Sequence, residues 1–272
     1  MIAVVLLLLL ICLAAPAALA WRLWRLHEPG RLAWLIVLAE TAVFLSLVLL
    51  LGRWDMAGMW SRVVLVGAVG AAAVVSLMRH ARRPWQATGA LPVWHSHGHR
   101  LVSLALSGMA LVYVVSGLIA RDRPHALAFP LDAGRFVVAQ GGGIGILNHH
   151  SGHRAQRHAV DITALGASGF RASGLLPHDP ARYAIFGKPV ISPCDGTVAA
   201  AVDGLPDLSP PQADRNNPAG NHVVLACGGL LVELAHLRKG SVVVAVGKPV
   251  RIGDPIGEVG NSGNSTEPHL HI

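Results

Sequence analysis

Four long apolar segments in the first half of this 272-residue chain limit what it can fold into. A helix needs about 20 apolar residues to cross the hydrocarbon core of a bilayer. Each segment reaches or approaches that length almost without charge, and they cover residues 2–20, 32–51, 63–78 and 101–120. Hydrophobic residues make up 53% of the chain and charged residues 14%, a balance that a water-soluble globule of this size could hardly bury. The sequence therefore predicts an α-helical bundle of about four transmembrane helices.

The arginines between these segments predict the orientation of the bundle, because short loops rich in Lys and Arg stay in the cytoplasm. The second connection has only Arg53 and Arg62, offset by Asp55, whereas the first and third hold Arg22, Arg25, Arg31, Arg79, Arg82, Arg83 and Arg100. Four crossings then leave the second half of the chain outside the cytoplasm. Cleavage of residues 1–20 as a signal peptide is an alternative, and it has the same consequence for the second half.

The net charge of +7 does not indicate a nucleic-acid partner. The arginines of the first half separate apolar runs and form no continuous basic stripe, so they are better explained as a topology signal. Glu40 is the one acidic residue inside an apolar segment. Since burying a lone charge in lipid is costly, we expect Glu40 to face the bundle or a polar partner.

The composition changes beyond residue 120, where Gly, Pro, Asp and His become frequent. We expect an anchor over residues 1–120, a linker over 121–135 and an all-β domain over 136–272. Turn residues separate short β-type runs at 136–138, 159–162, 189–192, 196–202, 222–225, 230–234, 241–246 and 255–259. The tetrapeptide Gly-Lys-Pro-Val occurs at 187–190 and at 247–250, which predicts two related hairpin-like units.

The histidines of the second half indicate a metal site. His269 and His271 are two residues apart, and on a strand that spacing points both rings to the same face. Asp161 lies in the β-type run at 159–162, where a charged side chain needs a partner, and His236 ends another such run. A His, Asp and His set with an open fourth position is typical of catalytic zinc.

The second half also resembles a known family. The sequences FGKPVISPCDGTV, GNHVVL, LAHL and GKPVRIGDPIGEVGNSGNSTEPHLHI are similar to those of the lysostaphin and LytM type of zinc endopeptidases, which cut the peptide bridges of bacterial peptidoglycan. The resemblance covers residues 137–272 and implies a β-sheet peptidase fold. It also implies that Asp161 and His271 bind Zn²⁺, while His236 and His269 flank the reacting carbonyl.

Position 157 departs from this pattern. The family usually has a histidine four residues before the ligand aspartate, but this chain has Arg157, which cannot give up a proton to bind zinc. The candidates for the missing ligand are His149, His150, His153 and His158. We favour His150, because the stretch resembles a branch of the family in which Asn-x-His precedes a Gln-Arg pair. A histidine-rich surface loop without a metal is the alternative.

These residues predict a mechanism in which zinc held by His150, Asp161 and His271 activates a water molecule. His269 would act as general base or orient the water, and His236 would donate a hydrogen bond to the developing oxyanion. We therefore expect a zinc metallo-endopeptidase that is anchored in a bacterial cytoplasmic membrane, with its peptidase domain on the periplasmic or extracellular side. Its expected substrate is a peptidoglycan peptide.

Two alternatives and several open points remain at this stage. Loss of zinc affinity at Arg157 would leave a degenerate domain that regulates or recruits cell-wall enzymes, and a sensor or transporter in the membrane half would make the β domain an accessory. The sequence determines neither whether Cys194 and Cys227 pair nor the oligomeric state. The last strand is expected to continue past Ile272, which would make the sequence a fragment.

Overall fold

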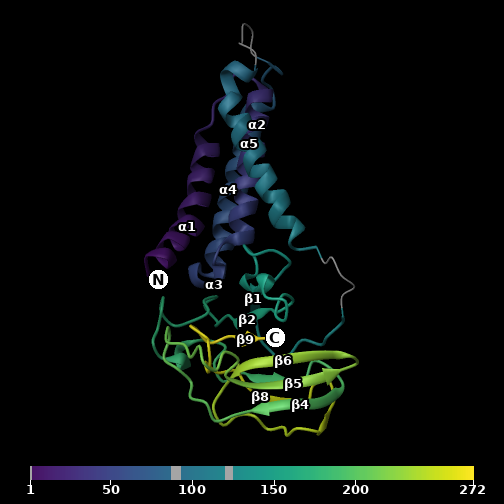
Figure 1. Ribbon diagram of the computed structural model, residues 1–272. Coiled ribbons are helices and arrows are strands. Elements are labelled where there is room, and N and C mark those ends of the chain that lie inside the picture. Colours follow the sequence, from purple (N-terminus) through teal and green to yellow (C-terminus); the bar gives the residue numbers. More distant parts are fainter. Residues whose placement is uncertain (1, 87–92, 120–124) are drawn as a thin grey trace. The chain divides into compact units, whose positions relative to one another are not determined.

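The computed structural model describes residues 2–86, 93–119 and 125–272, and it divides the chain into two compact units. One unit lies within Met1–Ile119 and is helical, and the other lies within Ala120–Ile272 and is built of β-strands (Figure 1). The division follows the change in composition beyond residue 120. Each unit is described by itself below.

The helical unit contains four long helices, as the apolar segments predict. They are α1 (Ile2–Arg25), α2 (Arg31–Leu51), α4 (Met59–His80) and α5 (Val93–Ser116), with a short α3 (Trp54–Ala57) before α4. All four are long and apolar enough to cross a membrane, over Ala3–Arg25, Arg31–Leu51, Met59–His80 and Trp94–Ser116. Gly58 before α4 has a φ of 89°, which glycine adopts readily, and a Cβ at Gly52 would lie only 2.5 Å from Val48 O.

Charged groups inside this unit are paired, which limits the cost of burying them. Glu40 on α2 is 5% exposed, and its carboxylate accepts a hydrogen bond from Arg22 of α1 at 2.5 Å. This contact confirms the expectation that Glu40 has a polar partner. Glu28, between α1 and α2, pairs with Arg100 of α5 at 2.7 Å, and its backbone N–H donates to Nε2 of the buried His80. These contacts connect α1 with α2, and they join the segment between those two helices to α4 and α5.

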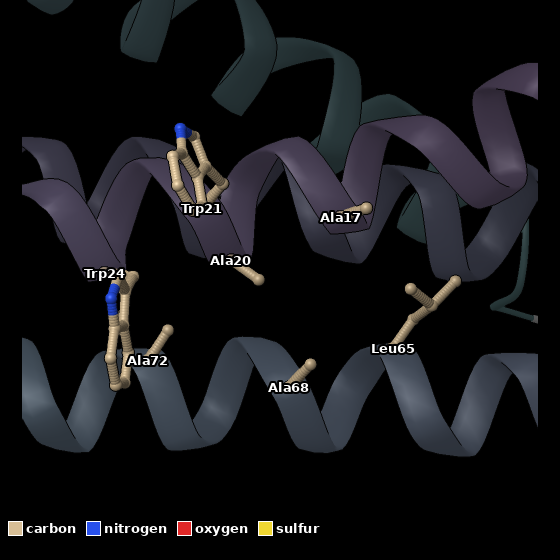
Figure 2. Close-up of a pocket in the computed structure, with 7 residues that line it drawn as sticks. All are labelled: Ala17, Ala20, Trp21, Trp24, Leu65, Ala68 and Ala72. Atoms are coloured by element: carbon tan, nitrogen blue, oxygen red, sulfur yellow. The ribbon is translucent and has the colours of Figure 1, made fainter.

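A shallow apolar groove of about 470 Å³ lies between α1 and α4 (Figure 2). Small side chains allow the two helices to approach closely, and the lining consists of Ala17, Ala20, Trp21, Trp24, Leu65, Ala68 and Ala72. Arg25 lies over the Trp21 ring and Arg79 over the Trp24 ring, at 5.5 and 5.6 Å from the ring centroids. Tryptophan and arginine together are typical of the head-group level of a membrane.

The β unit is an antiparallel arrangement of nine strands in two sheets. The larger sheet has seven strands in the order β1-β2-β9-β6-β5-β4-β7, and the smaller one pairs β3 with β8. The strands are Phe136–Gln140, Asp161–Ala164, Pro189–Ile191, Gly196–Val202, Asn221–Cys227, Leu230–Leu237, Pro249–Val250, Pro255–Glu258 and Leu270–His271, numbered β1 to β9 in that order. Over the described residues 125–272 the helical turns are the 3₁₀ segments η1 (His149–Gly152) and η2 (Pro180–Arg182).

One hydrophobic core holds the two sheets together. It contains side chains from both, with Val190 and Ile256 of the small sheet beside residues such as Val223, Leu225 and Leu270 of the large one. Leu131 also belongs to this core, at 4% exposure, and it forms a bridge with Val190. Leu131 lies in the segment expected as a linker, so the part of that segment next to β1 packs as part of the β unit. Residues 120–124 of the expected anchor and linker lie outside the described residues.

Most of the predicted β-type runs form strands, but residues 241–246 do not. The N–H of Val242 donates to Asp203 Oδ2, and Ser241 Oγ donates to Arg238 O. These side-chain hydrogen bonds use backbone groups that strand pairing would need. The N–H of Val243 still donates one backbone hydrogen bond, to the carbonyl of Ile256. The two Gly-Lys-Pro-Val segments do begin strands, with Gly187 and Gly247 at φ 74° and 82°. However, β3 pairs with β8 and β7 with β4, so the expected pair of equivalent hairpin units is not present.

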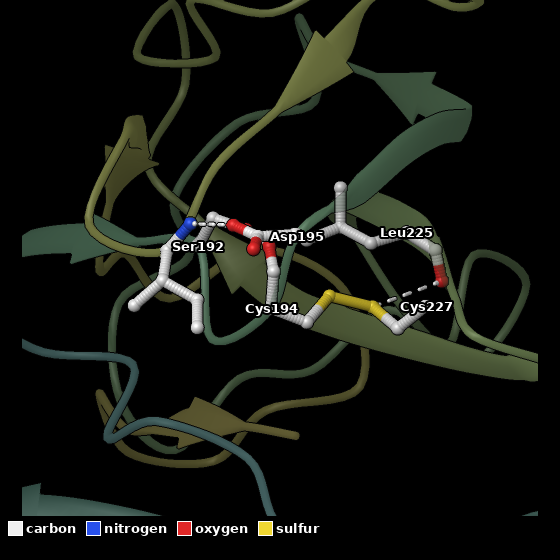
Figure 3. Close-up of a disulfide and its surroundings, with 6 residues drawn as sticks. Ser192, Cys194, Asp195, Leu225 and Cys227 are labelled. Atoms are coloured by element: carbon white, nitrogen blue, oxygen red, sulfur yellow. Dashed lines mark hydrogen bonds between the residues drawn. A yellow bond between two sulfur atoms is a disulfide. The ribbon is translucent and has the colours of Figure 1, made fainter.

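A disulfide links Cys194 to Cys227 across this core (Figure 3). The bond joins the loop after β3 to the end of β5, and it closes a loop with a sequence separation of 33 residues. It settles the pairing that the sequence left open. Disulfides persist in oxidising compartments, so the bond fits a domain outside the cytoplasm.

Replacing both Cys194 and Cys227 with alanine should lower the free energy of unfolding of the β unit by about 3–5 kcal/mol, because the unfolded chain regains loop entropy. The measurement is pulse proteolysis in urea of the purified 272-residue chain, following the β unit. Cys12→Ala is the control, since Cys12 is a free cysteine in the helical unit. An unchanged urea midpoint in the double variant would show that the bond does not stabilise the fold.

Candidate metal centre

The register of three neighbouring strands gathers the predicted site residues. Asp161, the first residue of β2, is the direct partner of His271 on β9, and His271 is in turn the partner of Ala235 on β6. Directly opposed residues of an antiparallel pair have side chains on the same face, with Cβ atoms about 5 Å apart. Asp161 and His271 therefore meet although 110 residues separate them in sequence.

Asp161 is the centre of the cluster. Its Oδ1 accepts a hydrogen bond from Nδ1 of His271 at 2.8 Å, and Nε2 of His150 lies 3.1 Å from both of its oxygens. Nε2 of His269 is 3.6 Å from Oδ1. Asp161 and His271 are each 5% exposed, while the side chain of His150 is 12% exposed and that of His269 is 20% exposed. The cluster thus opens toward solvent on the side of the two latter rings.

An irregularity in β6 brings His236 to the same place. Regular alternation would turn His236 away from the face of Ala235 and His271. The pairing of β5 with β6 shifts register between Asn221 and Val223, and His236 has a φ of 61°, which a non-glycine residue seldom adopts. Such bulges re-aim side chains next to functional sites. The result is a His236 ring 5.8 Å from the His271 ring and 4.8 Å from the His269 ring, measured between centroids.

Asn148 fixes the turn that carries His150. It is fully buried and caps η1, where its Oδ1 accepts a hydrogen bond from the backbone N–H of His150 at 3.0 Å. Its Nδ2 donates to the carbonyls of Gly142 and Ala159 at 3.1 Å, and to that of Arg157 at 3.4 Å. One side chain therefore connects the His150 turn to the segment that leads into Asp161.

A second set of contacts fixes His269. Its Nδ1 donates to the carbonyl of Glu267 at 2.8 Å and lies 3.2 Å from Ser265 Oγ. The Glu267 carboxylate pairs with Arg171, which is 3% exposed. This buried guanidinium anchors the loop before His269, which leaves Nε2 of that ring facing Asp161.

The geometry fits a small metal ion with nitrogen and oxygen ligands. Zinc binds His and carboxylate ligands at about 2.0–2.2 Å in a tetrahedron, which places neighbouring ligand atoms about 3.3 Å apart. The distances of 2.8 and 3.1 Å from Asp161 to His271 and His150 are close to that spacing. Ligand atoms lie within 4.8 Å of one another in two sets, His236 with His269 and His271, and His149 with His150 and Asp161. Asp161 and His271 connect the two sets.

The other candidate histidines are exposed or make contacts with residues other than Asp161. His149 is exposed, its ring centroid lies 3.7 Å from that of His150 with the planes tilted by 40°, and its Nδ1 lies 3.1 Å from Gln140 Oε1. His153 and His158 are exposed. Arg157 is exposed as well, and its Nε donates to Nε2 of His158 at 3.1 Å. The guanidinium therefore bonds to His158 and not to Asp161, and His150 is the candidate that the structure brings against this carboxylate.

Comparison with known proteins shows a family match for the C-terminal part of the chain. Residues 178–272 match the family model described as Peptidase family M23. This segment is a peptidase family M23 domain. It includes His236, His269 and His271, whereas His150 and Asp161 precede the matched residues. The fold class expected from the resemblance, apolar helices followed by a lysostaphin-like β domain, is thereby confirmed.

A curated relative is the peptidoglycan DD-endopeptidase ShyA of Vibrio cholerae, 36% identical over 126 residues. The alignment covers 43% of this chain but only 26% of that relative. Similar solved structures include the catalytic domain of lysostaphin from Staphylococcus simulans, with 22% identity, a TM-score of 0.28, and coverage of 53% of this chain and 75% of that one. A zinc-containing peptidase from Vibrio cholerae has 21% identity, a TM-score of 0.26, and coverage of 42% and 45%. The assignment to the family rests on the sequence match.

Electrostatics separate the roles of the site residues. Burial by itself would raise the pKa of Asp161, but the hydrogen bond from His271 and the charges of His269 and His150 bring it below the ordinary value. Burial, together with repulsion from His269 and His271, lowers the pKa of His236 well below 6.5. At neutral pH the centre of this M23 domain therefore combines an ionised carboxylate with a neutral His236.

The hydrogen bond of His236 fixes its tautomer. Nδ1 lies 2.9 Å from the carbonyl oxygen of Ser262, which can only accept, so the ring proton is on Nδ1. A neutral ring then presents a lone pair at Nε2. This argues against the expected role of His236 as a hydrogen-bond donor to an oxyanion, unless the ring first gains a proton.

Three contributors to the site carried no predicted role: Asn148, Arg171 and Ser262. Asn148 was visible only as part of the Asn-x-His similarity, and no spacing rule indicates that its amide bridges two segments. Arg171 and Ser262 act through partners distant in sequence, Glu267 and His236. Only the folded arrangement identifies such contacts.

The lowered pKa of His236 predicts a pH dependence of stability. Because the ring binds a proton more weakly in the folded than in the unfolded chain, the metal-free protein should lose stability as the pH falls below about 6.5. His236→Asn removes this titration, and asparagine tolerates the left-handed backbone better than most residues. Urea midpoints from pulse proteolysis at pH 7.5, 6.5 and 5.5 should fall more steeply for the original chain than for H236N. Parallel slopes would contradict a depressed pKa at His236.

Proposed function

We propose that the M23 domain is a zinc metallo-endopeptidase with His150, Asp161 and His271 as the ligands. The observation that carries this proposal is the convergence of the two imidazole nitrogens on the Asp161 carboxylate, at 2.8 and 3.1 Å. Two histidines and one carboxylate form a known catalytic zinc set, which leaves a fourth position for water. The partly exposed sides of His150 and His269 give that position access to a substrate.

We infer that the substrate is a peptide of bacterial peptidoglycan. The support is the family match together with the similarity to a peptidoglycan DD-endopeptidase. The chain spans about a quarter of that relative's length, so cleavage of peptidoglycan by this chain is itself a proposal. The four apolar helices would anchor the enzyme in a bacterial cytoplasmic membrane. Positive-inside topology and the Cys194–Cys227 disulfide then favour a periplasmic or extracellular position for the domain.

Zinc bound at this position would supply a Lewis acid that polarises the peptide carbonyl and makes water a nucleophile near neutral pH. The residues of the chain provide orientation and proton transfer. Asp161, held ionised by its surroundings, would contribute a negative charge that partly neutralises the ion. The bond from Asn148 to the His150 backbone keeps the third ligand in place.

His269 is the best-placed general base. Its Nδ1 proton is bound to the Glu267 carbonyl, so Nε2 presents a lone pair toward Asp161 and the open side of the centre. Nε2 of His236 presents a second lone pair from a buried position, and we propose that it accepts a hydrogen bond from water rather than donating one to an oxyanion. Once Nε2 of His269 has taken a proton, that ring can return it to the leaving amine.

The alternative is a degenerate domain that regulates or recruits cell-wall enzymes. Arg157 stands at the family's usual ligand position and would account for such a loss. The arrangement here favours catalysis, because Arg157 is exposed and bonds to His158, while His150 lies against Asp161 from the loop. A degenerate domain would have no need for a bulged strand that brings His236 beside His269 and His271.

The ligand set can be tested by zinc content in single variants of the 272-residue chain purified in detergent. His271→Ala, Asp161→Ala and His150→Ala should each abolish bound zinc, because a site with two remaining protein ligands holds the ion poorly. His269→Ala should retain zinc and lose most hydrolysis of purified peptidoglycan. His149→Ala, His153→Ala and His158→Ala are matched controls from the same loop and should retain both.

Two outcomes would contradict this assignment in different ways. Zinc retained by His150→Ala but lost from one of the three control variants would move the third ligand to that residue. A correctly folded original chain that binds no zinc would favour the regulatory domain, with Arg157 as the explanation.

Topology can be tested by fusing a reporter that is active only outside the cytoplasm after Arg135. The positive-inside rule predicts activity at this point and none for a matched fusion after Arg83, in the third connection. A cytoplasmic signal after Arg135 would exclude peptidoglycan as the substrate, since that polymer lies outside the membrane.

A further inference from the structure

Arg157 has no role in the proposed zinc chemistry, yet it borders the metal centre. Its backbone carbonyl accepts a hydrogen bond from Asn148 Nδ2, and the same amide side chain accepts one from the N–H of His150. Four residues later the chain enters β2 at Asp161. Arg157 thus lies next to the turn that carries His150, whose ring is partly exposed.

The segment around Arg157 is strongly basic. Residues 141–160 contain two arginines and four histidines and no acidic residue. Arg154 and Arg157 are both exposed, and in the described part of the β unit Arg157 bonds to the neighbouring His158 and to no carboxylate. A surface arginine without an acidic partner leaves its two terminal nitrogens available for a ligand.

The metal centre adds to this positive field. A divalent ion with one carboxylate ligand and neutral histidines would carry a net positive charge, so the metal centre and the segment around Arg157 would have the same sign. Such a site attracts anionic groups, and a guanidinium binds a carboxylate through two parallel hydrogen bonds. A peptide cut near its end presents a free terminal carboxylate close to the reacting bond.

We propose that Arg157 binds a carboxylate of the substrate beside the scissile bond, so that the domain prefers peptides with a free carboxylate there. This inference rests on the proposed endopeptidase function. It gives the residue that departs from the family's ligand pattern a role in substrate choice, whereas a purely solvated arginine would leave that choice unchanged.

The test uses the zinc-loaded 272-residue chain in detergent and a synthetic cross-linked stem peptide in two forms, the free acid and its carboxamide. We expect kcat/KM to be about five- to tenfold higher for the acid, the range of a charge-assisted hydrogen bond at a partly exposed site. Arg157→Gln should remove this preference by slowing cleavage of the acid alone, with zinc content unchanged. Arg157→Lys should keep part of it, because the charge remains while the paired geometry is lost.

Arg251→Gln is the matched control. Arg251 is exposed and follows β7, at the edge of the large sheet opposite to β1 and β2. Its replacement by glutamine changes the net charge by the same amount as Arg157→Gln, but far from the centre. The preference for the acid should survive in Arg251→Gln. In the original chain, this preference should weaken as the salt concentration is raised. Equal rates on both peptides in the original chain, or an equal loss on both in Arg157→Gln, would overturn the inference.

Binding of fluorescently labelled forms of both peptides to the same proteins separates this inference from the function on which it rests. If neither peptide is cleaved but the acid binds more tightly in an Arg157-dependent way, the endopeptidase proposal fails and the specificity of Arg157 stands. If peptides are cleaved but neither rate nor affinity depends on Arg157, the specificity fails and the endopeptidase stands. If the peptides are not cleaved and bind equally, both are rejected.

Discussion

The buried carboxylate of Asp161 is the group around which the β unit is organised. It begins a four-residue strand that is buried along its whole length, where an unpaired charge would be costly. Its partners come from a loop, His150, and from the last strand, His271. Because burying Asp161 without partners is unfavourable, folding brings three distant segments of the sequence together at this carboxylate. The same negative charge favours binding of a cation there.

The surrounding structure keeps these partners in position. The order β2-β9-β6 places Asp161, His271 and the neighbour of His236 on adjacent strands, and the hydrophobic core behind them includes Leu270, between the two histidines of the pair. Asn148 and the Arg171–Glu267 pair act on the two elements that are not regular strand, the His150 turn and the loop before His269. Regular strands need only their ladder bonds, whereas irregular segments depend on buried polar side chains for the same precision.

The sequence predicted the parts of this arrangement that follow from periodicity and residue chemistry. Apolar length gave the four helices, alternation gave most strands, and the His-x-His pair with Asp161 indicated a metal site. It failed where side chains compete with the ladder, as Asp203 does at residues 241–246. It could not assign the proton of His236, because that depends on a carbonyl 26 residues away in sequence, Ser262, and on burial. The disulfide was equally undetermined, since spacing does not show that β3 and β5 end side by side.

In the proposed assignment, His150 supplies the ligand that the family usually has at position 157. A histidine there would bind the metal from the segment that leads into the strand. With arginine, the ligand must come from elsewhere, and the loop of residues 149–152, capped by Asn148, is close enough to Asp161 to supply it. The side chain at 157 is then released to face solvent at the edge of the centre. Under this proposal, a ligand from the loop depends on an additional buried amide, that of Asn148, and Arg157 adds a positive group beside the centre.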